Sequence, residues 1–301
     1  MRVIQAQSAG FCYGVERAVR MAEEAAAAGG CVMLGSIIHN DSVVRRLEAL
    51  GARQVQSAEE VQPGETALIR AHGEPVETYR TLEARGARVL DATCPHVLRI
   101  HRLVERAEQE GRTPLIIGED HHPEVIAAAS RSSRSVVLGN AEELAEWLAA
   151  VPARRTERLL AVAQTTCIRS IWEKCVIFLK KECTNAEIFD TICDATQKRQ
   201  SEAADIAGRV DVMVVVGDRK SANTKHLSEI CSTRCARVYQ IEGAEELRAD
   251  FLNGCSVAGL TAGASTPAGI IKEVYATMSE EIKNMEATEE SFEEMLEKSF
   301  K

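Results

Sequence analysis

Three cysteines of this chain occupy the same place in three similar stretches of sequence. Cys12, Cys94 and Cys193 each stand just before a segment with helical periodicity, which leads to an apolar strand that ends at a glycine. The spacings from cysteine to glycine are 23, 24 and 24 residues. Thiolates supplied singly from distant segments differ from the CxxC pairs of structural zinc sites. They suit an iron–sulfur cluster, in which each cysteine binds a different iron.

Three cysteine ligands leave one iron of a four-iron cluster without a protein ligand. Such an iron is a Lewis acid next to a store of electrons, so the pattern predicts a catalytic [4Fe–4S] cluster. Each cysteine also precedes a predicted helix, whose first N–H groups favour a thiolate. Three alternatives stay open at this point. They are buried structural cysteines, a zinc site made of cysteine and histidine, and the fully ligated cluster of a redox sensor or electron carrier.

The other seven of the ten cysteines fall outside this register. They are Cys31, Cys167, Cys175, Cys183, Cys231, Cys235 and Cys255. The trio from Cys167 to Cys183 recurs every eight residues, and Cys231 and Cys235 form a CxxxC pair, but neither pattern has supporting histidines. We therefore expect these seven cysteines in the core or at incidental positions. A local zinc site at the CxxxC pair is the alternative.

Polar side chains that suit an anion follow the predicted strands in all three stretches. They are His39 with Asn40, His72, His122, Thr165, Ser221, Asn223 and Ser265. Imidazoles, hydroxyls and amides at loop starts and helix N-termini bind phosphate groups. The chain has no GxxxxGK[ST] segment. The sequence therefore predicts a diphosphate site without a phosphate-binding lysine loop.

Glu124 is the one carboxylate within this polar set, two residues after His122 in HHPEV. A carboxyl group in a dry site near an anionic cluster and a diphosphate should have a raised pKa. Glu124 is therefore the expected proton donor. The alternative role is that of a helix N-terminal acid after Pro123, and both roles are compatible.

The three stretches also predict the architecture. Apolar strands such as VMVVV alternate with helical segments, which is typical of a parallel α/β fold. We predict three pseudo-symmetric α/β lobes, each with a small, mainly parallel sheet, arranged as a trefoil around a central cluster. The expected lobes are residues 1–94, 95–193 and 194–278, followed by an acidic tail at 279–301, and the N-terminal strand is allowed to pair outside the first lobe. Because ligands bind beyond the carboxyl ends of parallel strands, the polar set should gather there.

Composition limits the remaining function classes. The 301 residues carry a formal net charge of -9, which argues against a general nucleic-acid binder. Eight glutamates and three lysines lie between Ser279 and Lys301, so more than half of this charge belongs to the tail. The sequence has no apolar run of the about 20 residues that a membrane helix needs, and it starts without a signal-peptide pattern. We expect a cytoplasmic protein.

The combination of motifs resembles one known family. FCYGVERAV, SIIHN, RAHGEP, DATCPHV, HHPEV, QTT, CDAT, SANT and AGASTP follow one another in order. Over roughly residues 1–277 the chain is similar to the 4-hydroxy-3-methylbut-2-enyl diphosphate reductases, the LytB/IspH family of the non-mevalonate isoprenoid pathway. The resemblance implies the last step of that pathway. In that step two electrons and two protons remove the 4-hydroxyl of the substrate as water and give isopentenyl and dimethylallyl diphosphate.

The resemblance also implies residue roles. Cys12, Cys94 and Cys193 would bind a [4Fe–4S] cluster, and Glu124, Thr165 and His122 would be catalytic. The substrate diphosphate would be held by His39, His72, His122, Ser221, Asn223 and Ser265, while Thr165 would orient the hydroxyl. A ferredoxin or flavodoxin would supply the electrons.

Two departures from the family pattern stand out. Ala222 replaces the second serine that many relatives have before the asparagine, and neighbouring N–H groups are expected to take over that phosphate contact. The tail resembles the linker that precedes ribosomal S1-type RNA-binding repeats in some relatives. Nucleic acid is therefore an expected partner only if such a domain is normally attached. The alternative for the tail is a solvated acidic end.

Overall fold

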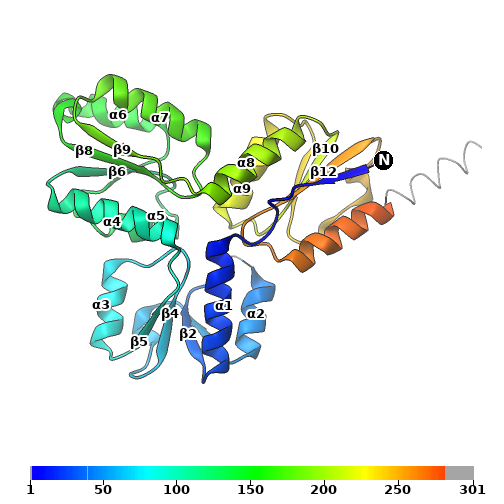
Figure 1. The fold of residues 1–301 in the computed structure, drawn as a ribbon, viewed down its shortest axis with the longest axis horizontal. Coiled ribbons are helices and arrows are strands. Elements are labelled where there is room, and N and C mark those ends of the chain that lie inside the picture. Colours follow the sequence, from blue (N-terminus) through cyan, green and yellow to red (C-terminus); the bar gives the residue numbers. More distant parts are fainter. Residues whose placement is uncertain (1, 39, 282–301) are drawn as a thin grey trace, which may run out of the picture. The chain divides into compact units, whose positions relative to one another are not determined.

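The structure is a computed structural model that describes residues 2–38 and 40–281. It has an α/β fold with three separate four-stranded sheets, and every strand pair in the described part of the chain is parallel (Figure 1). The predicted fold class, three small parallel sheets in an α/β protein, is confirmed.

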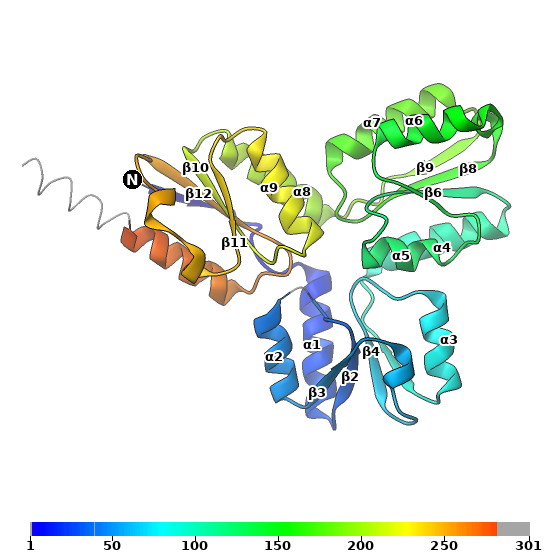
Figure 2. The same ribbon diagram turned by 180° about the vertical axis from the view of Figure 1, so that it is seen from behind.

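The first sheet has the strand order β3-β2-β4-β5. Its strands are β2 (Cys31–Leu34), β3 (Ala52–Val55), β4 (Thr66–Ile69) and β5 (Arg88–Asp91). The helical elements around it are α1 (Tyr13–Ala27), α2 (Asp41–Ala49), η1 (Ala58–Glu60) and α3 (Val76–Ala84). Figure 2 shows α1 and α2 beside β2 and β3, and Figure 1 shows α3 next to β5.

The second sheet has the order β7-β6-β8-β9. Its strands are β6 (Thr113–Ile117), β7 (Val136–Leu138), β8 (Leu159–Ala163) and β9 (Ala186–Phe189). Its helical elements are α4 (Pro95–Gln109), α5 (Pro123–Ala129), α6 (Ala141–Ala150), η2 (Pro152–Thr156) and α7 (Arg169–Glu182).

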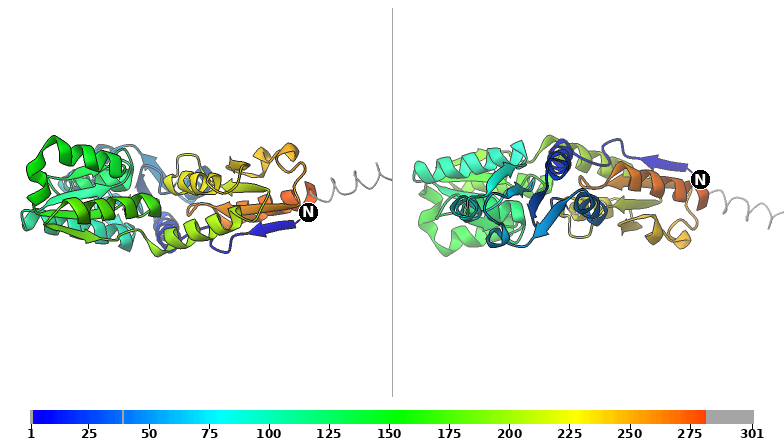
Figure 3. Two further views of the ribbon diagram at one scale, coloured as in Figure 1. Left: turned by 90° about the horizontal axis from the view of Figure 1, so that it is seen from above. Right: turned by 90° about the horizontal axis from the view of Figure 1, so that it is seen from below.

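The third sheet has the order β1-β12-β10-β11. Its strands are β1 (Arg2–Gln5), β10 (Val212–Val216), β11 (Val238–Ile241) and β12 (Val257–Ala262). Its helical elements are α8 (Asp194–Ala207), α9 (Ala222–Ser232), η3 (Ala244–Glu246), η4 (Ala249–Phe251) and residues 268–281. The N-terminal strand pairs with β12, from Arg2 opposite Val257 to Gln5 opposite Leu260, so it lies in the third sheet and not the first (Figure 3).

The three sheets share one topology. In each, the first strand of the stretch (β2, β6 or β10) lies between the second and the third, and the fourth place is taken by β5, β9 or β1. After the first strand, the chain thus adds the second strand on one side of it and the third strand on the other side. In open α/β sheets, ligands bind at the carboxyl ends of the two central strands on either side of such a reversal. The predicted polar residues follow these central strands.

The core alternates across each sheet because successive strand side chains point to opposite faces. In the second sheet, Leu115 and Ile117 pack with the buried residues of α6 and α7, including Trp172. Ile116, between them, packs with α4 and α5 through residues such as Val104. Figure 1 shows this sheet between the two helix pairs. Both faces are therefore covered, which explains the near-continuous apolar strands.

Five of the seven other cysteines are buried, including Cys31 of β2. Cys167 and Cys175 pack around Trp172, and Cys231 and Cys235 pack against the third sheet. The CxxxC pair is thus part of the apolar core, as expected. All ten cysteines are free thiols.

The chain divides into two compact units. One contains Cys12–Gln197, with the first and second sheets, and the other contains Met1–Phe11 and Lys198–Lys301, with the third. The predicted division into lobes 1–94, 95–193 and 194–278 stays a prediction. Most of the predicted tail, residues 282–301, lies outside the described residues. None of the described helices is both long and apolar enough to cross a membrane.

Candidate cluster and diphosphate site

Cys12 and Cys94 come together at the start of two helices. Cys12 is the N-cap of α1, and Cys94 is the N-cap of α4, which has Pro95 at its first position. Gly14 lies between them, since a Cβ atom there would be 2.7 Å from Cys94 Sγ and 4.0 Å from Cys12 Sγ. Two sulfurs from distant segments thus lie within 4.0 Å of one point, over a residue without a side chain.

Cys193 lies just before α8, in a similar position. Its sulfur accepts hydrogen bonds from the Thr196 backbone N–H at 3.3 Å and contacts the Thr196 hydroxyl at 3.1 Å. Burial raises the pKa of Cys193, and the charges of Cys12 and Glu124 add to that rise. Burial likewise raises the pKa of Cys94 to about 11, with further contributions from Cys12 and Cys193. The three sulfurs therefore share one electrostatic neighbourhood.

This donor set fits a cluster. Repulsion and burial keep Cys94 and Cys193 protonated until metal ions supply positive charge, and helix N–H groups from His96, Val97 and Thr196 favour the thiolates. Among residues 2–38 and 40–281, no group of three His, Cys, Asp or Glu side chains is placed to hold a single metal ion. Ligands to three different irons need not converge on one point.

Glu124 and Thr165 form a buried pair next to these cysteines. Glu124 is 2% exposed; its Oε1 accepts from the Thr165 backbone N–H and its Oε2 from the Thr165 hydroxyl, both at 2.6 Å. Burial raises the pKa of Glu124 to about 7, although the two Thr165 donors act to lower it. The Thr165 carbonyl accepts from the Cys193 backbone N–H at 3.1 Å. Thr165 therefore bridges Glu124, the expected proton donor, and Cys193, a proposed cluster ligand.

His122 and His72 lie next to each other. His122 is the N-cap of α5, with its Nδ1 accepting from the Glu124 backbone N–H at 3.2 Å. This bond leaves Nε2 as the protonated nitrogen of a neutral ring. The His72 ring, from the loop after β4, lies edge-on to it with a centroid separation of 5.4 Å. His39 lies outside the described residues.

Ser221, Asn223 and Ser265 lie in the other compact unit. Ser221 is the N-cap of α9 and accepts from the Thr224 N–H at 3.5 Å. Asn223 is 5% exposed, and its Nδ2 has no hydrogen-bond partner within the described part of the chain. Ser265 is buried beyond the end of β12. A buried amide donor without a hydrogen-bond partner costs free energy, and an anion bound at Asn223 would remove that cost.

Three contributors were missed by the sequence analysis. Gly14 makes room for two sulfurs, Thr196 donates to Cys193, and Thr224 packs its hydroxyl against Gly217 and Gly263. A Cβ on Gly263 would be 2.2 Å from that hydroxyl, so the two glycines leave room for the Thr224 side chain. The motifs CYG, CDAT and SANT contained these residues, but their roles depend on contacts between segments.

The sequence also matches a known family. The family model described as LytB protein matches residues 3–279. The chain belongs to the LytB protein family. A relative from Caldanaerobacter subterraneus, named 4-hydroxy-3-methylbut-2-enyl diphosphate reductase, is 38% identical over 97% of this chain and 100% of its own length. A protein of the same name from Aquifex aeolicus is 37% identical over 92% of this chain and 96% of its own length.

Solved structures agree with this LytB membership. One, described as (E)-4-hydroxy-3-methyl-but-2-enyl diphosphate reductase, the terminal enzyme of the non-mevalonate pathway, has 37% identity and a TM-score of 0.66, and covers 93% of this chain and 99% of its own. The E-1-hydroxy-2-methyl-but-2-enyl-4-diphosphate reductase from Plasmodium falciparum has 26% identity and a TM-score of 0.85, with 90% and 85% covered.

Proposed function

We propose that this LytB chain catalyses the reaction of its named relatives, the reductive dehydroxylation of (E)-4-hydroxy-3-methylbut-2-enyl diphosphate. The C–O bond to the 4-hydroxyl breaks, two electrons and two protons are consumed, and water leaves. The remaining allylic carbons take one proton, which gives isopentenyl diphosphate or dimethylallyl diphosphate. The observation that carries the proposal is the Glu124–Thr165 pair, which adjoins Cys193 within the unit that also brings Cys12 and Cys94 together.

Cys12, Cys94 and Cys193 are the proposed ligands of a [4Fe–4S] cluster. Such a cluster, when bound, supplies electrons and an iron without a protein ligand that acts as a Lewis acid for the leaving hydroxyl. The chain contributes three thiolates, the N–H donors that stabilise them and a glycine, Gly14, whose missing side chain lets the sulfurs of Cys12 and Cys94 approach each other.

Glu124 is the proposed proton source. With a pKa of about 7 its carboxyl is partly protonated at neutral pH, which suits a general acid. Thr165 holds both carboxyl oxygens, so the acid keeps one orientation. The Thr165 hydroxyl, which contacts Glu124 Oε2, is the proposed relay of this proton to the substrate hydroxyl. Burial of the pair keeps bulk water away from this step.

The diphosphate is the proposed ligand of His39, His72, His122, Ser221, Asn223 and Ser265. The neutral His122 ring offers its Nε2–H, and Asn223 offers an Nδ2–H that no described residue uses. Ser221 opens α9, whose first N–H groups add positive potential for an anion. Those N–H groups replace the hydroxyl that Ala222 lacks.

The electrons come from an external one-electron carrier, for which a ferredoxin or a flavodoxin is the proposed class. The proposed partners of this chain are the allylic diphosphate substrate and this electron carrier. Nucleic acid becomes a partner only with an attached S1-type domain.

Anaerobic turnover of the hydroxylated diphosphate with a reduced electron donor tests the function. We expect Glu124→Gln to retain iron, sulfide and substrate binding but to lose at least about a hundredfold in kcat, because an amide does not donate a proton. Asp120→Asn, four residues earlier with a side chain that is 86% exposed, is the matched control and should keep the wild-type rate. Equal rates for Glu124→Gln and the wild type would remove Glu124 from the proton path.

Metal analysis after anaerobic purification separates the rival functions. The proposal requires iron and acid-labile sulfide that disappear in Cys12→Ser, Cys94→Ser and Cys193→Ser. Zinc without sulfide would overturn the cluster. Iron and sulfide without any turnover would instead favour a redox sensor or electron carrier.

A further inference from the structure

The loop that carries His72 is held by residues that follow α5. Arg131 Nη2 donates to the Glu74 carbonyl oxygen at 3.2 Å, and the Arg131 side chain is only 8% exposed. Its neighbour Ser130 accepts from the Val76 backbone N–H at 3.1 Å through its hydroxyl. The loop links β4 of the first sheet to α3, so these two consecutive residues bind the loop at Glu74 and the first residue of α3 at Val76.

His101 of α4 supports the same loop from beneath. A Cβ on Gly73 would lie 2.7 Å from His101 Cε1, so the imidazole fills the space of the missing side chain. Gly73 has a φ of +74°, a conformation that also favours glycine. Gly73, directly after His72, is therefore fixed by the buried His101 ring of α4, a helix of the second sheet.

Arg131 and His101 also hold each other. Arg131 Nη2 lies 3.3 Å from His101 Nδ1. A guanidinium only donates, so Nδ1 accepts and the imidazole is neutral. Burial, and then the Arg131 charge, lower the pKa of His101 to about 4, which agrees with that neutral form. One guanidinium nitrogen thus contacts both the loop carbonyl and the ring under Gly73.

The buried Arg131 guanidinium has further partners. Its Nε lies 3.6 Å from Glu105 Oε1, and its guanidinium lies 5.4 Å from the centre of the Tyr79 ring. A buried cation is tolerated only where such partners surround it. Displacing the loop would remove the Glu74 carbonyl from this set, so the Arg131 environment favours the position of the loop seen here.

We propose that Arg131 is a positioning residue that keeps His72 facing His122, and thereby sets the affinity for the substrate diphosphate. Helix α5 connects the two features, because it carries His122 at its N-cap and Arg131 follows just after its C-terminal end. Fixing the loop to the far end of α5 fixes the separation of the two imidazoles, 5.4 Å between centroids. The role in substrate affinity rests on the proposed function, whereas the role in loop order does not.

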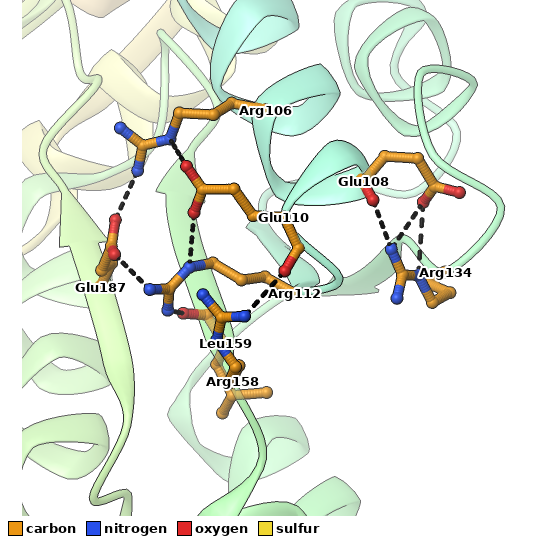
Figure 4. A network of polar contacts seen from close by, with 8 residues as sticks. All are labelled: Arg106, Glu108, Glu110, Arg112, Arg134, Arg158, Leu159 and Glu187. Carbon is orange, nitrogen blue, oxygen red and sulfur yellow. Dashed lines mark hydrogen bonds and ion pairs between the residues drawn. The ribbon is translucent and has the colours of Figure 1, made fainter.

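The test compares Arg131→Gln with Arg131→Lys and with a control, Arg134→Gln. Arg134 is 41% exposed and binds Glu108 instead of the loop (Figure 4). We expect Arg131→Gln to speed hydrogen exchange of the Gly73 and Val76 amides and to raise KM, each by about tenfold, for the loss of a charged hydrogen bond. Iron content and kcat should change less than about twofold, because the cysteines and Glu124 are untouched. Arg131→Lys, which keeps the charge, should lie closer to the wild type, and Arg134→Gln should match it.

Each measurement has a result that overturns the proposal. Wild-type exchange in the Gly73–Val76 peptide of Arg131→Gln would show that Arg131 does not order the loop. Faster local exchange with an unchanged KM would show that the loop order does not govern substrate affinity. Faster exchange throughout the chain together with loss of iron would reduce Arg131 to general stability. Absence of turnover in the wild type would reject the proposed function, while the exchange data would still decide whether Arg131 orders the loop.

Discussion

Glu124 illustrates at the scale of one residue how burial prepares a group for chemistry. The carboxyl is almost completely buried, and its two oxygens bind one threonine through a backbone N–H and a hydroxyl. Those donors stabilise the ionised form, but desolvation outweighs them and raises the pKa to about 7. The result is an acid that holds a proton near neutral pH and keeps a fixed direction.

The rate should therefore fall with rising pH. Because the acid acts in its protonated form, kcat/KM of the wild type should be constant below a pH of about 7 and fall about tenfold per pH unit above it. A pH profile of anaerobic turnover checks this. The residual activity of Glu124→Gln should lack this limb, and an alkaline limb that persists in this variant would assign the ionisation to another group.

The same pKa shift predicts a stability difference. A carboxyl whose pKa is raised from 4.5 to about 7 stabilises the fold fully below 4.5 and loses that contribution as the pH rises through 7. Gln does not ionise. Going from pH 4.5 to pH 8, the free energy of unfolding should therefore fall by about 3 kcal/mol more for the wild type than for Glu124→Gln. Denaturant titrations at both values check it, and parallel pH dependences would contradict the raised pKa.

At the scale of elements, helix starts place the sulfurs. Cys12 and Cys94 are N-caps, and Gly14 in the first turn of α1 lets the two helix starts approach.

The C-terminal end of α4 is held by ion pairs. Arg106 and Glu110, near the end of α4, form an ion-pair network with Arg112 and with Glu187 of β9 (Figure 4). The network fixes the end of α4 that is remote from Cys94.

Gly14→Ala should impair cluster assembly. The new Cβ would lie 2.7 Å from Cys94 Sγ, so the sulfur must rotate away from its place near Cys12. We expect less than about half of the wild-type iron and sulfide after anaerobic reconstitution, since metal sites require well-placed ligands. Gly269→Ala is the control, because nothing lies within 4 Å of the added atom. Full iron content in Gly14→Ala would show that the cysteines adapt.

Glu187→Ala should destabilise the protein. It removes one partner each from Arg106 and from Arg112, whose side chain is only 10% exposed. Glu187 itself is 37% exposed, so we expect a loss of roughly 1–2 kcal/mol in the free energy of unfolding. Denaturant titration measures it. Glu24→Gln, in an exposed pair with Arg20, should change stability by less than about 0.5 kcal/mol, and an equal effect of both variants would make the network an ordinary surface feature.

At the scale of the whole molecule, the proposed cluster links segments that are far apart in the sequence. Cys12 opens the unit Cys12–Gln197, Cys94 lies between its two sheets along the chain, and Cys193 comes near its end. Such a cluster would be shared by the two sheets of this unit. A ligand that binds only the folded chain stabilises it by mass action.

Loss of the cluster should lower the Tm. We expect the anaerobic, iron-loaded protein to melt roughly 5–10 °C above the same protein after air exposure, because the folded state loses a tightly bound group. Differential scanning fluorimetry under both conditions measures this. Cys193→Ser should show no such difference, while Cys183→Ser, outside the proposed ligand set, should retain it. A wild type with equal Tm values despite loss of iron would contradict the stabilising link.

Local pattern determined much of this protein. The apolar strands, the glycines after them and the cysteines before the helices depend on residues close in sequence, so the sequence predicted three parallel sheets and the loops that carry His72, His122 and Ser221. It also allowed the N-terminal strand to pair elsewhere. The register of that strand, with Arg2 opposite Val257, was determined only by the tertiary structure, because an apolar pattern does not specify which strand it pairs with.

Contacts between distant segments were decided only by the tertiary structure. Glu124 and Thr165 are 41 positions apart, and their double hydrogen bond follows from the side-by-side pairing of β6 and β8. Gly14 beneath Cys94 and His101 beneath Gly73 are likewise packing results between elements that local sequence does not relate. The residue types thus predicted the kind of chemistry. The raised pKa of Glu124 arose from burial, and the approach of the two sulfurs arose from packing at Gly14, and both require the folded chain.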